Sequence, residues 1–423
     1  MKCEELNINK KLIDRLLVSK FDELTPIQEK CIPEISRGND LVGQAETGSG
    51  KTLAFCLPLV DKIFPGEGLQ AIVLTPTREL CVQVTDVFLE YGRKLGLKTT
   101  SIYGGVKIEP QIKHLRSTEI VIGTPGRMLD HTRRKTIDFS NVCFFVLDET
   151  DKMFEMGFIG DVEEIIRKIP GKRQTLMFSA TISNDINGLI KKHSNNPTIV
   201  RTKSYVDPSK LKQIYYDIYE KNNKFSILVH LLRNNKQGLS IVFCATRREA
   251  DAVERNLRHQ GIPALAIHGG MRQNKRMDSL NALKNQKAKV LVATDVAARG
   301  LDIKNVTYIY NYDVPMTSKD YIHRIGRTAR AGEKGAAVTL LTKRDHDNFR
   351  RVQSNDDLRI DKMMIPNFKK IDFMRKFEKR EKTIQKPHHT FRTQSKTQSF
   401  GRGKQHHRYG SPHSKRSKNS NSL

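Results

Sequence analysis

The segment Ala45–Thr52 has the residue types and spacing of a phosphate-binding loop. Its glycines allow backbone N–H groups to face phosphate oxygens, and the positive end of the helix predicted over 53–64 adds to that attraction. Lys51 is then expected to meet the β- and γ-phosphates of a nucleotide, and Thr52 to hold Mg²⁺. Because the strict pattern begins with glycine where this chain has alanine, a glycine-rich turn before a helix is the alternative. The residues predicted to surround the nucleotide are Ala45, Thr47, Gly48, Ser49, Gly50, Lys51 and Thr52.

Two adjacent carboxylates, Asp148 and Glu149, follow the apolar run 143–147. A nucleoside triphosphatase needs such acids at the end of a strand that neighbours the one before the phosphate loop. Asp148 is predicted to bind Mg²⁺ through water, and Glu149 to orient and deprotonate the attacking water. An acidic strand end that caps the next helix is the alternative. The phosphate loop upstream favours catalysis.

Buried parallel strands must hold these motifs in place. From 40 to 181, short apolar runs alternate with longer amphipathic segments, and after a polar stretch the alternation resumes. Such runs predict parallel strands joined by helices, and therefore two α/β domains. One strand leads into Pro76–Glu79 and another into Ala245–Glu249, a weak echo which suggests that the domains share a fold. The predicted strands include 71–74, 120–122, 143–147, 175–178, 240–243, 264–267, 290–293, 306–310 and 336–341.

The chain is predicted to divide into a first domain at 1–200, a linker at 201–212, a second domain at 213–373 and a tail at 374–423. Strands are expected to stop after about Leu341, where a helix leads toward the tail. The tail is basic and polar with too little apolar surface for a core, so we expect it to be disordered. Its arginines alternate with aromatic residues, which suits sequence-tolerant RNA binding, and a solubilising charge run is the alternative.

The composition of the whole chain indicates a polyanionic partner. Its 423 residues carry 74 Lys and Arg against 46 Asp and Glu, a net charge of +28 with a pI near 9.8. Nucleic acid is the first candidate. No apolar run approaches the roughly 18 residues that cross a bilayer, so no membrane partner is expected. The six cysteines are widely spaced and show no C-x-x-C pair, which favours a reducing compartment and hence the cytoplasm.

Four ordered motifs, Asp148–Asp151, Ser179–Thr181, Ala293–Asp302 and His323–Arg330, resemble those of the DEAD-box RNA helicases of superfamily 2. The resemblance runs roughly from 6 to 341. It implies two tandem RecA-like domains with parallel sheets, ATP in the cleft between them and single-stranded RNA across both. It also implies an RNA-stimulated ATPase that uses ATP and Mg²⁺, and it extends to compact members of archaeal or bacterial type.

The resemblance assigns further residues around ATP. Gln28 is similar to the glutamine that reads the adenine edge, with Phe21 beside it, and Asp302 to a ribose contact. Arg327 and Arg330 resemble arginine fingers that stabilise charge on the γ-phosphate. The predicted catalytic residues are therefore Glu149, Asp148, Lys51, Arg327 and Arg330, and the residues that couple ATP to RNA are Ser179, Thr181 and His323.

RNA contacts are expected from loops that follow strand ends. Such loops offer N–H, hydroxyl and guanidinium groups to phosphates and 2′-hydroxyls, so binding independent of sequence is expected. Helix capping by Thr77 or Thr124, and solvated positions for Arg78 and Arg127, are the alternatives. The predicted contacts are Pro76, Thr77, Arg78, Gly104, Gly105, Thr124, Pro125, Gly126, Arg127, Gln273, Arg276 and Thr294.

The chain departs from the family pattern at a few positions. Cys3 stands where an isolated aromatic residue is usual, which leaves part of the adenine-stacking site vacant, and Lys20 and Leu24 replace a common glycine and proline. Thr150 replaces the usual alanine between the acids, and activity is expected to survive because the acids are intact.

These patterns predict an ATP-dependent RNA helicase that opens short duplexes locally. The predicted partner is RNA, bound by a monomer that ribonucleoproteins recruit, with ribosome assembly or RNA remodelling as the task. An ATP-gated RNA clamp or annealing chaperone is the second hypothesis, and a DNA-directed motor is the third.

Overall fold

The computed structural model describes residues 1–19, 22–46, 48–202, 210–235, 238–298, 303, 305–329 and 334–374. Two seven-stranded, wholly parallel sheets organise these residues, one in each half of the chain. Helices connect the strands, as parallel pairing requires. The predicted α/β architecture is confirmed.

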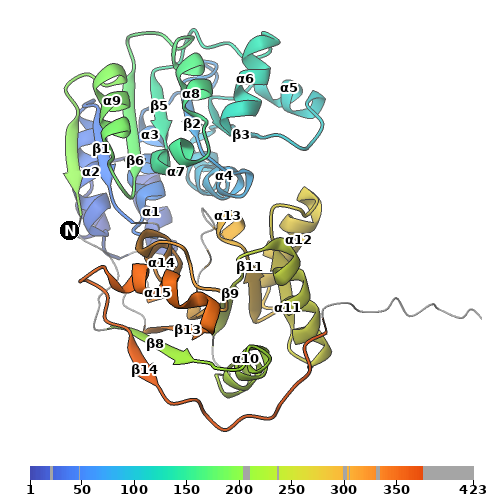
Figure 1. Cartoon of the computed structure of the whole chain (residues 1–423). Helices are drawn as coiled ribbons and strands as arrows, with labels where there is room; N and C mark the ends of the chain where they lie inside the picture. The colour runs from blue at the N-terminus through green and yellow to red at the C-terminus, as the bar shows by residue number, and fades with distance from the viewer. Residues whose placement is uncertain are drawn as a thin grey trace, which may run out of the picture. The chain divides into compact units, whose positions relative to one another are not determined.

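The first sheet has the strand order β3-β4-β2-β5-β6-β1-β7. Its strands are short, and the central ones are buried along their whole length, which explains why they appear in the sequence as unbroken apolar runs. In Figure 1 this part of the chain is coloured from blue to green. The strands are β1 (Leu41–Gln44), β2 (Ala71–Leu74), β3 (Thr99–Ile102), β4 (Ile120–Gly123), β5 (Phe144–Leu147), β6 (Gln174–Ser179) and β7 (Thr198–Arg201).

Helices cover both faces of the first sheet. Alternate strand residues point to opposite faces, so Ala71 and Val73 join one apolar cluster while Ile72 and Leu74 join the other. One face is covered by α1 (Lys10–Val18), α2 (Pro26–Ser36), α3 (Lys51–Lys62) and α4 (Arg78–Gly92). The other is covered by α6 (Pro125–Arg133), α7 (Thr150–Glu155), α8 (Ile159–Ile166) and α9 (Asn184–His193), and α5 (Glu109–Leu115) lies after β3.

The second sheet has the order β10-β11-β9-β12-β13-β8-β14. Its strands are β8 (Leu211–Asp217), β9 (Leu239–Phe243), β10 (Ala264–Ile267), β11 (Val290–Ala293), β12 (Val306–Asn311), β13 (Gly335–Leu341) and β14 (Asp361–Met363). Residues of α10 (Asn223–Asn234) and α11 (Arg247–His259) form one apolar cluster. The other cluster includes residues of α12 (Gln273–Lys284), α13 (Asp295–Ala298), α14 (Ser318–Ile325) and α15 (His346–Gln353).

The two sheets repeat one topology. Numbered from the first strand of each half, both have the order 3-4-2-5-6-1-7. The echo between the two halves of the sequence therefore reflects a shared fold. Each strand of the first sheet has a counterpart in the second.

Three of the predicted boundaries need correction. The linker expected at 201–212 is narrower, because Arg201 ends β7 and Leu211 and Lys212 already belong to β8. Strands do not stop after Leu341, because β14 adds a seventh strand beside β8. Both β7 and β14 are edge strands with exposed polar residues, so they lack the apolar runs that identify the buried strands. The tail from 375 to 423 lies outside the described residues.

Candidate active site

The nucleotide motifs follow the carboxyl ends of β1, β5 and β6. Ala45 follows β1, Asp148 follows β5, and Ser179 ends β6. The acids were expected on a strand directly beside β1, but β6 lies between β1 and β5. Because Ser179 ends β6, it lies between the phosphate loop after β1 and the acids after β5. Open parallel sheets bind ligands at this edge.

The phosphate loop has the backbone that glycine permits. Gly48 and Gly50 have φ of 87° and 97°, in the left-handed region. A Cβ at Gly50 would overlap the amide of Gln28 and lie 2.8 Å from Thr25 Oγ1. The buried Lys51 ammonium donates to Ala45 O at 2.6 Å and so joins the first residue of α3 to the first residue of the loop. A glycine-lined turn that holds a cation at the start of α3 fits a polyphosphate.

Gln28 connects the start of α2 to the phosphate loop. Its Oε1 accepts from Thr25 N at 2.9 Å, and its Nε2 donates to Gly50 O at 3.1 Å. An amide oxygen has two lone pairs and an amide nitrogen two hydrogens. One acceptor site and one N–H therefore remain, which is the combination that an adenine edge needs.

The two acids are buried in different electrostatic surroundings. Burial raises the pKa of Asp148, and the nearby charge of Glu149 adds to the rise, against the opposing effect of Lys51. Burial also acts to raise the pKa of Glu149, but the charges of Lys152 and Lys51 outweigh it and hold that pKa below its ordinary value. Lys152 Nζ lies 2.7 Å from Glu149 Oε2, and both side chains are about 5% exposed. Asp148 and the half-buried Thr52 offer the hard oxygen donors that Mg²⁺ prefers.

Hydrogen bonds tie the strand end at Ser179 to the acidic motif. Ser179 O accepts from Ala45 N at 3.0 Å, and Ser179 Oγ accepts from Asp151 N at 3.2 Å. The Asp151 carboxylate accepts from both N and Oγ1 of Thr181 at 3.2 Å. The buried Thr150 hydroxyl donates to Phe178 O at 3.1 Å, so this departure from the family pattern adds a bond between the start of α7 and β6.

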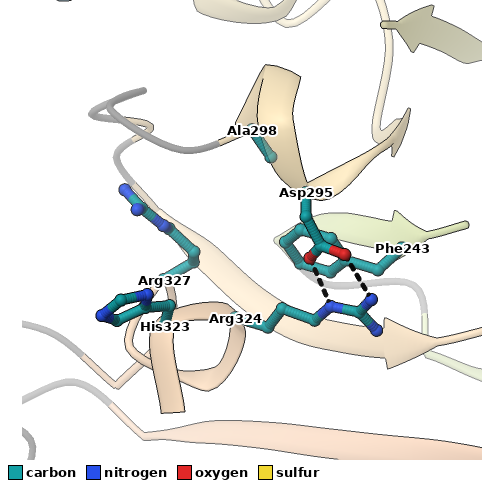
Figure 2. A pocket seen from close by; sticks show the side chains of 6 residues that line it. All are labelled: Phe243, Asp295, Ala298, His323, Arg324 and Arg327. Carbon is teal, nitrogen blue, oxygen red and sulfur yellow. Dashed lines mark hydrogen bonds and ion pairs between the residues drawn. The ribbon is translucent and has the colours of Figure 1, made fainter. Parts of the chain in front are cut away.

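Arg324, which the sequence interpretation missed, anchors α14 in the second domain. Its guanidinium donates to both carboxylate oxygens of Asp295, at 2.6 and 2.7 Å, and to Asn311 and Asp313 O. In Figure 2 these two side chains face each other, while His323 and Arg327 lie on the other side of the same pocket. The positive charge of Arg327 also acts to lower the Glu149 pKa. Arg324 lies three residues before the expected finger Arg327, but its partners lie elsewhere in the sequence, so no local pattern identified it.

Arg78 covers the two glycines after β3. A Cβ at Gly104 would lie 3.3 Å from Arg78 Nη2, and one at Gly105 would overlap the guanidinium. The Thr77 hydroxyl accepts from Leu80 N at 3.3 Å and therefore caps α4. This is the helix-capping role that was the alternative to RNA contact for Thr77. Pro76 is buried beside it.

The first turn of α6 has an exposed residue at Gly126. Thr124 makes no side-chain cap hydrogen bond, and Pro125 fills the first helical position. Arg127 donates through Nη2 to Val106 O at 3.0 Å, and its side chain is 12% exposed. Its guanidinium is thus engaged inside the domain, Pro125 is buried, and Gly126 is the exposed residue of this turn.

The second domain repeats the arrangement of Arg78 and its glycines. Arg247 begins α11 as Arg78 begins α4, and its guanidinium lies 3.5 Å from where a Cβ at Gly269 would stand. Neither Arg247 nor the exposed pair Gly269 and Gly270 was among the predicted contacts. The echo between Pro76–Glu79 and Ala245–Glu249 was the signal that could have found them.

Two predicted RNA contacts of the second domain are engaged by Glu79. Gln273 Nε2 donates to its carboxylate at 2.8 Å, and Arg276 Nη2 lies 3.2 Å from it. Arg78 also donates to Gln273 Oε1, at 3.5 Å. Thr294 is buried directly after β11.

Some predicted site residues lie outside the described part of the chain, namely Phe21, Thr47, Asp302 and Arg330. Cys3 is described, and it is fully buried in the apolar cluster that contains Leu6 and Leu24. Its backbone N–H donates to Asp22 O at 3.2 Å. The Cys3 side chain therefore belongs to the core of the first domain.

Two family models match the chain. Residues 25–189 match the DEAD/DEAH box helicase family, and residues 223–332 match the helicase conserved C-terminal domain. The ATP-dependent RNA helicase CshA of Listeria monocytogenes is 42% identical over 370 residues, which cover 87% of this chain and 71% of that protein. The CshA of Bacillus subtilis is 42% identical over 366 residues, or 86% of this chain and 74% of that protein. The chain belongs to the DEAD-box RNA helicases.

Solved structures agree with this assignment. A DEAD box protein from Methanococcus jannaschii is 39% identical with a TM-score of 0.54, over 86% of this chain and 99% of that one. Saccharomyces cerevisiae Dbp5, bound to RNA and ADP BeF3, is 30% identical with a TM-score of 0.78, over 86% of this chain and 96% of that one. This DEAD-box protein is an RNA helicase and an ATPase, with tandem RecA-like domains and RNA as its partner. Among its described helices, none is long and apolar enough to cross a membrane.

Proposed function

We propose that this helicase opens short RNA duplexes locally, by closing its two domains on ATP and RNA and releasing them after hydrolysis. The observation that carries the proposal is the position of Ser179. Its backbone bonds to the phosphate loop through Ala45, and its hydroxyl bonds to the acidic motif through Asp151. A change at the γ-phosphate therefore reaches β5 and β6 through direct hydrogen bonds.

In this proposal the chain supplies charge, position and a base. Lys51 leaves Ala45 O to bind the β- and γ-phosphates, and Gln28 uses its remaining N–H and lone pair on adenine. Glu149 orients and deprotonates the attacking water, which requires Lys152 to release its carboxylate. Thr52 and Asp148 would hold Mg²⁺, which when bound neutralises phosphate charge. Arg327 and Arg330 complete the site from the second domain, with Asp302 at the ribose and His323 beside the acidic motif.

RNA is proposed to lie along the loops at the strand ends of both domains. Arg78 with Gly104 and Gly105, and the backbone of 124–126, serve the first domain. Arg247 with Gly269 and Gly270 serves the second, together with Gln273, Arg276 and Thr294. Guanidinium groups over exposed glycine backbone suit phosphates, which carry no base identity, so binding independent of sequence follows.

We further propose that the helicase acts as a monomer in the cytoplasm and that ribonucleoproteins such as assembling ribosomes recruit it. The chain's net charge of +28 favours an RNA-rich environment, and its cysteines, none of them in a C-x-x-C pair, favour a reducing one.

Strand displacement tests the proposed action. Short and long RNA duplexes are incubated with the full chain and ATP or a non-hydrolysable analogue, and a DNA duplex of the same sequence is the control. Separation of short RNA duplexes alone is expected, with repeated turnover only in ATP. RNA binding in ATP without any strand separation would favour the clamp, and equal action on DNA would contradict RNA selectivity.

A further inference from the structure

A buried hydrogen-bond network lies behind the two proposed RNA loops of the first domain. Its centre is Gln111 on α5, whose amide is 7% exposed. Gln111 Nε2 donates to Tyr103 O at 3.2 Å, directly before Gly104. Arg127 Nη1 donates to Gln111 Oε1 at 3.3 Å, while its Nη2 donates to Val106 O, directly after Gly105. One amide therefore touches both loops.

The network has one consistent direction of donation. Because Tyr103 O can only accept, Gln111 must present Nε2 to it and Oε1 to Arg127 and His131. His131 Nε2, 3.3 Å from that oxygen, must then carry a proton and donate. His131 Nδ1 is 2.8 Å from Thr136 Oγ1 and, in a neutral ring, accepts from that hydroxyl. Thr136 Oγ1 also lies 3.2 Å from His131 O, so its single proton serves one of these two acceptors.

The surroundings keep His131 neutral. Its side chain is fully buried, and burial together with the positive charge of Arg127 lowers its pKa. Arg134 acts in the same direction, while Asp130 opposes them. A ring held in one tautomer fixes the orientation of the Gln111 amide, which could otherwise flip.

We propose that Gln111 is a positioning residue that sets the spacing between the loop 103–106 and the loop 124–127, and thereby sets the affinity for RNA. The inference rests on the proposed function, because it takes these loops to be RNA contacts. Gln111 does not face RNA itself. It acts through the Tyr103 carbonyl and through Arg127, so its loss moves both loops at once.

The central test replaces Gln111 by leucine, which has similar size and makes no hydrogen bond. The RNA concentration for half-maximal ATPase stimulation is expected to rise about tenfold, while kcat at saturating RNA is retained. A purely structural role would instead lower kcat and the folded fraction together. The matched control is His114→Leu, an exposed position on the same helix, which should change neither value.

Gln111→Glu keeps the proposal falsifiable if the leucine variant does not fold. The carboxylate still accepts from Arg127 and His131, but it cannot donate to Tyr103 O, which it repels. We expect a weaker RNA response of the same kind, with the loop 103–106 alone displaced. Wild-type RNA response in both Gln111 variants would overturn the proposal.

Combination with Arg127→Met tests the route of action. If Gln111 acts partly through Arg127, the double variant with Gln111→Leu should lose less RNA affinity than the sum of the single losses. Additive losses would overturn the coupling.

The variant Arg78→Ala tests the proposed RNA site itself. If Arg78→Ala leaves RNA affinity unchanged, both proposals fail, whereas a loss in Arg78→Ala with none in Gln111→Leu refutes only the inference.

Discussion

Thr77 and Thr246 have the same backbone conformation, φ −126° and ψ 154°, and each hydroxyl accepts from the backbone N–H three residues later. Each follows the second strand of its sheet and starts a helix whose first residue is an arginine over a glycine pair. The resemblance between the halves therefore extends from topology to individual side chains. A feature proposed to bind phosphate in one half therefore has a structural counterpart in the other.

This equivalence predicts matched effects of Arg78→Ala and Arg247→Ala. Each change should weaken RNA binding and flatten the dependence of log K on log salt by about 0.7, the value of one lost phosphate contact on a single strand. Titration of a labelled single-stranded RNA at several salt concentrations measures both slopes. Arg233→Ala, an exposed arginine of α10, is the control. An unchanged slope for Arg247→Ala would contradict its role.

Glu149→Gln should abolish ATP turnover and preserve ATP binding. The amide cannot take a proton from water, while Lys51, Thr52 and Asp148 still hold phosphate and cation. Single-turnover hydrolysis and nucleotide binding are measured separately, with Glu164→Gln, at a half-buried position that pairs with Arg133, as control. Normal turnover in the Glu149 variant would refute the assignment of the base.

Gly50→Ala should disable the phosphate loop without unfolding the domain. The added Cβ would overlap the Gln28 amide, and φ of 97° is a conformation that alanine rarely adopts. We expect a loss of ATP affinity of about tenfold or more, because the loop and Gln28 must both move. Gly171→Ala, where nothing lies within 4 Å of the new Cβ, is the control for nucleotide titration. Wild-type affinity would show that the loop tolerates the strain.

The sequence predicted most of the site because its chemistry is local. A glycine loop before a helix, or two acids after an apolar run, can be recognised without knowing the partner strand. The position of β6 between β1 and β5 could not be predicted, since pairing order depends on packing of the whole sheet. Arg324 and Gln111 were missed for a related reason. Their partners lie elsewhere in the sequence, and a lone polar residue shows no pattern until the fold brings those partners close.

Cys3→Phe is expected to destabilise the first domain and leave ATP affinity unimproved. The thiol is fully buried in the apolar cluster that also contains Leu6, Leu12 and Leu24, so a ring would have to displace core side chains. Overpacking of this kind costs about 1–3 kcal/mol. Urea unfolding and ATP titration measure the two effects, with Cys3→Ser as a variant that adds no volume. Tighter ATP binding in Cys3→Phe would show that space for an aromatic ring does exist near the adenine.

His131 should make the first domain less stable in mild acid. Its pKa in the folded chain lies below the value of about 6.5 expected when unfolded, because burial and Arg127 disfavour the charged ring. Between those two pKa values the unfolded chain binds the extra proton, so the stabilisation is complete above about pH 6.5 and is lost as pH falls toward the folded pKa.

The variant His131→Gln tests this pH dependence, because its side chain can still donate to Gln111 and cannot titrate. Its urea midpoint should fall less than that of the wild type between about pH 7.5 and about pH 5.5. These two pH values lie roughly one unit on either side of the unfolded pKa. The exposed His114→Gln should retain the wild-type dependence. His193, whose pKa burial also lowers, titrates in all three proteins and cancels in the comparison. Parallel curves for wild type and His131→Gln would mean that folding does not lower the pKa of His131, which would contradict burial of a neutral ring at this position.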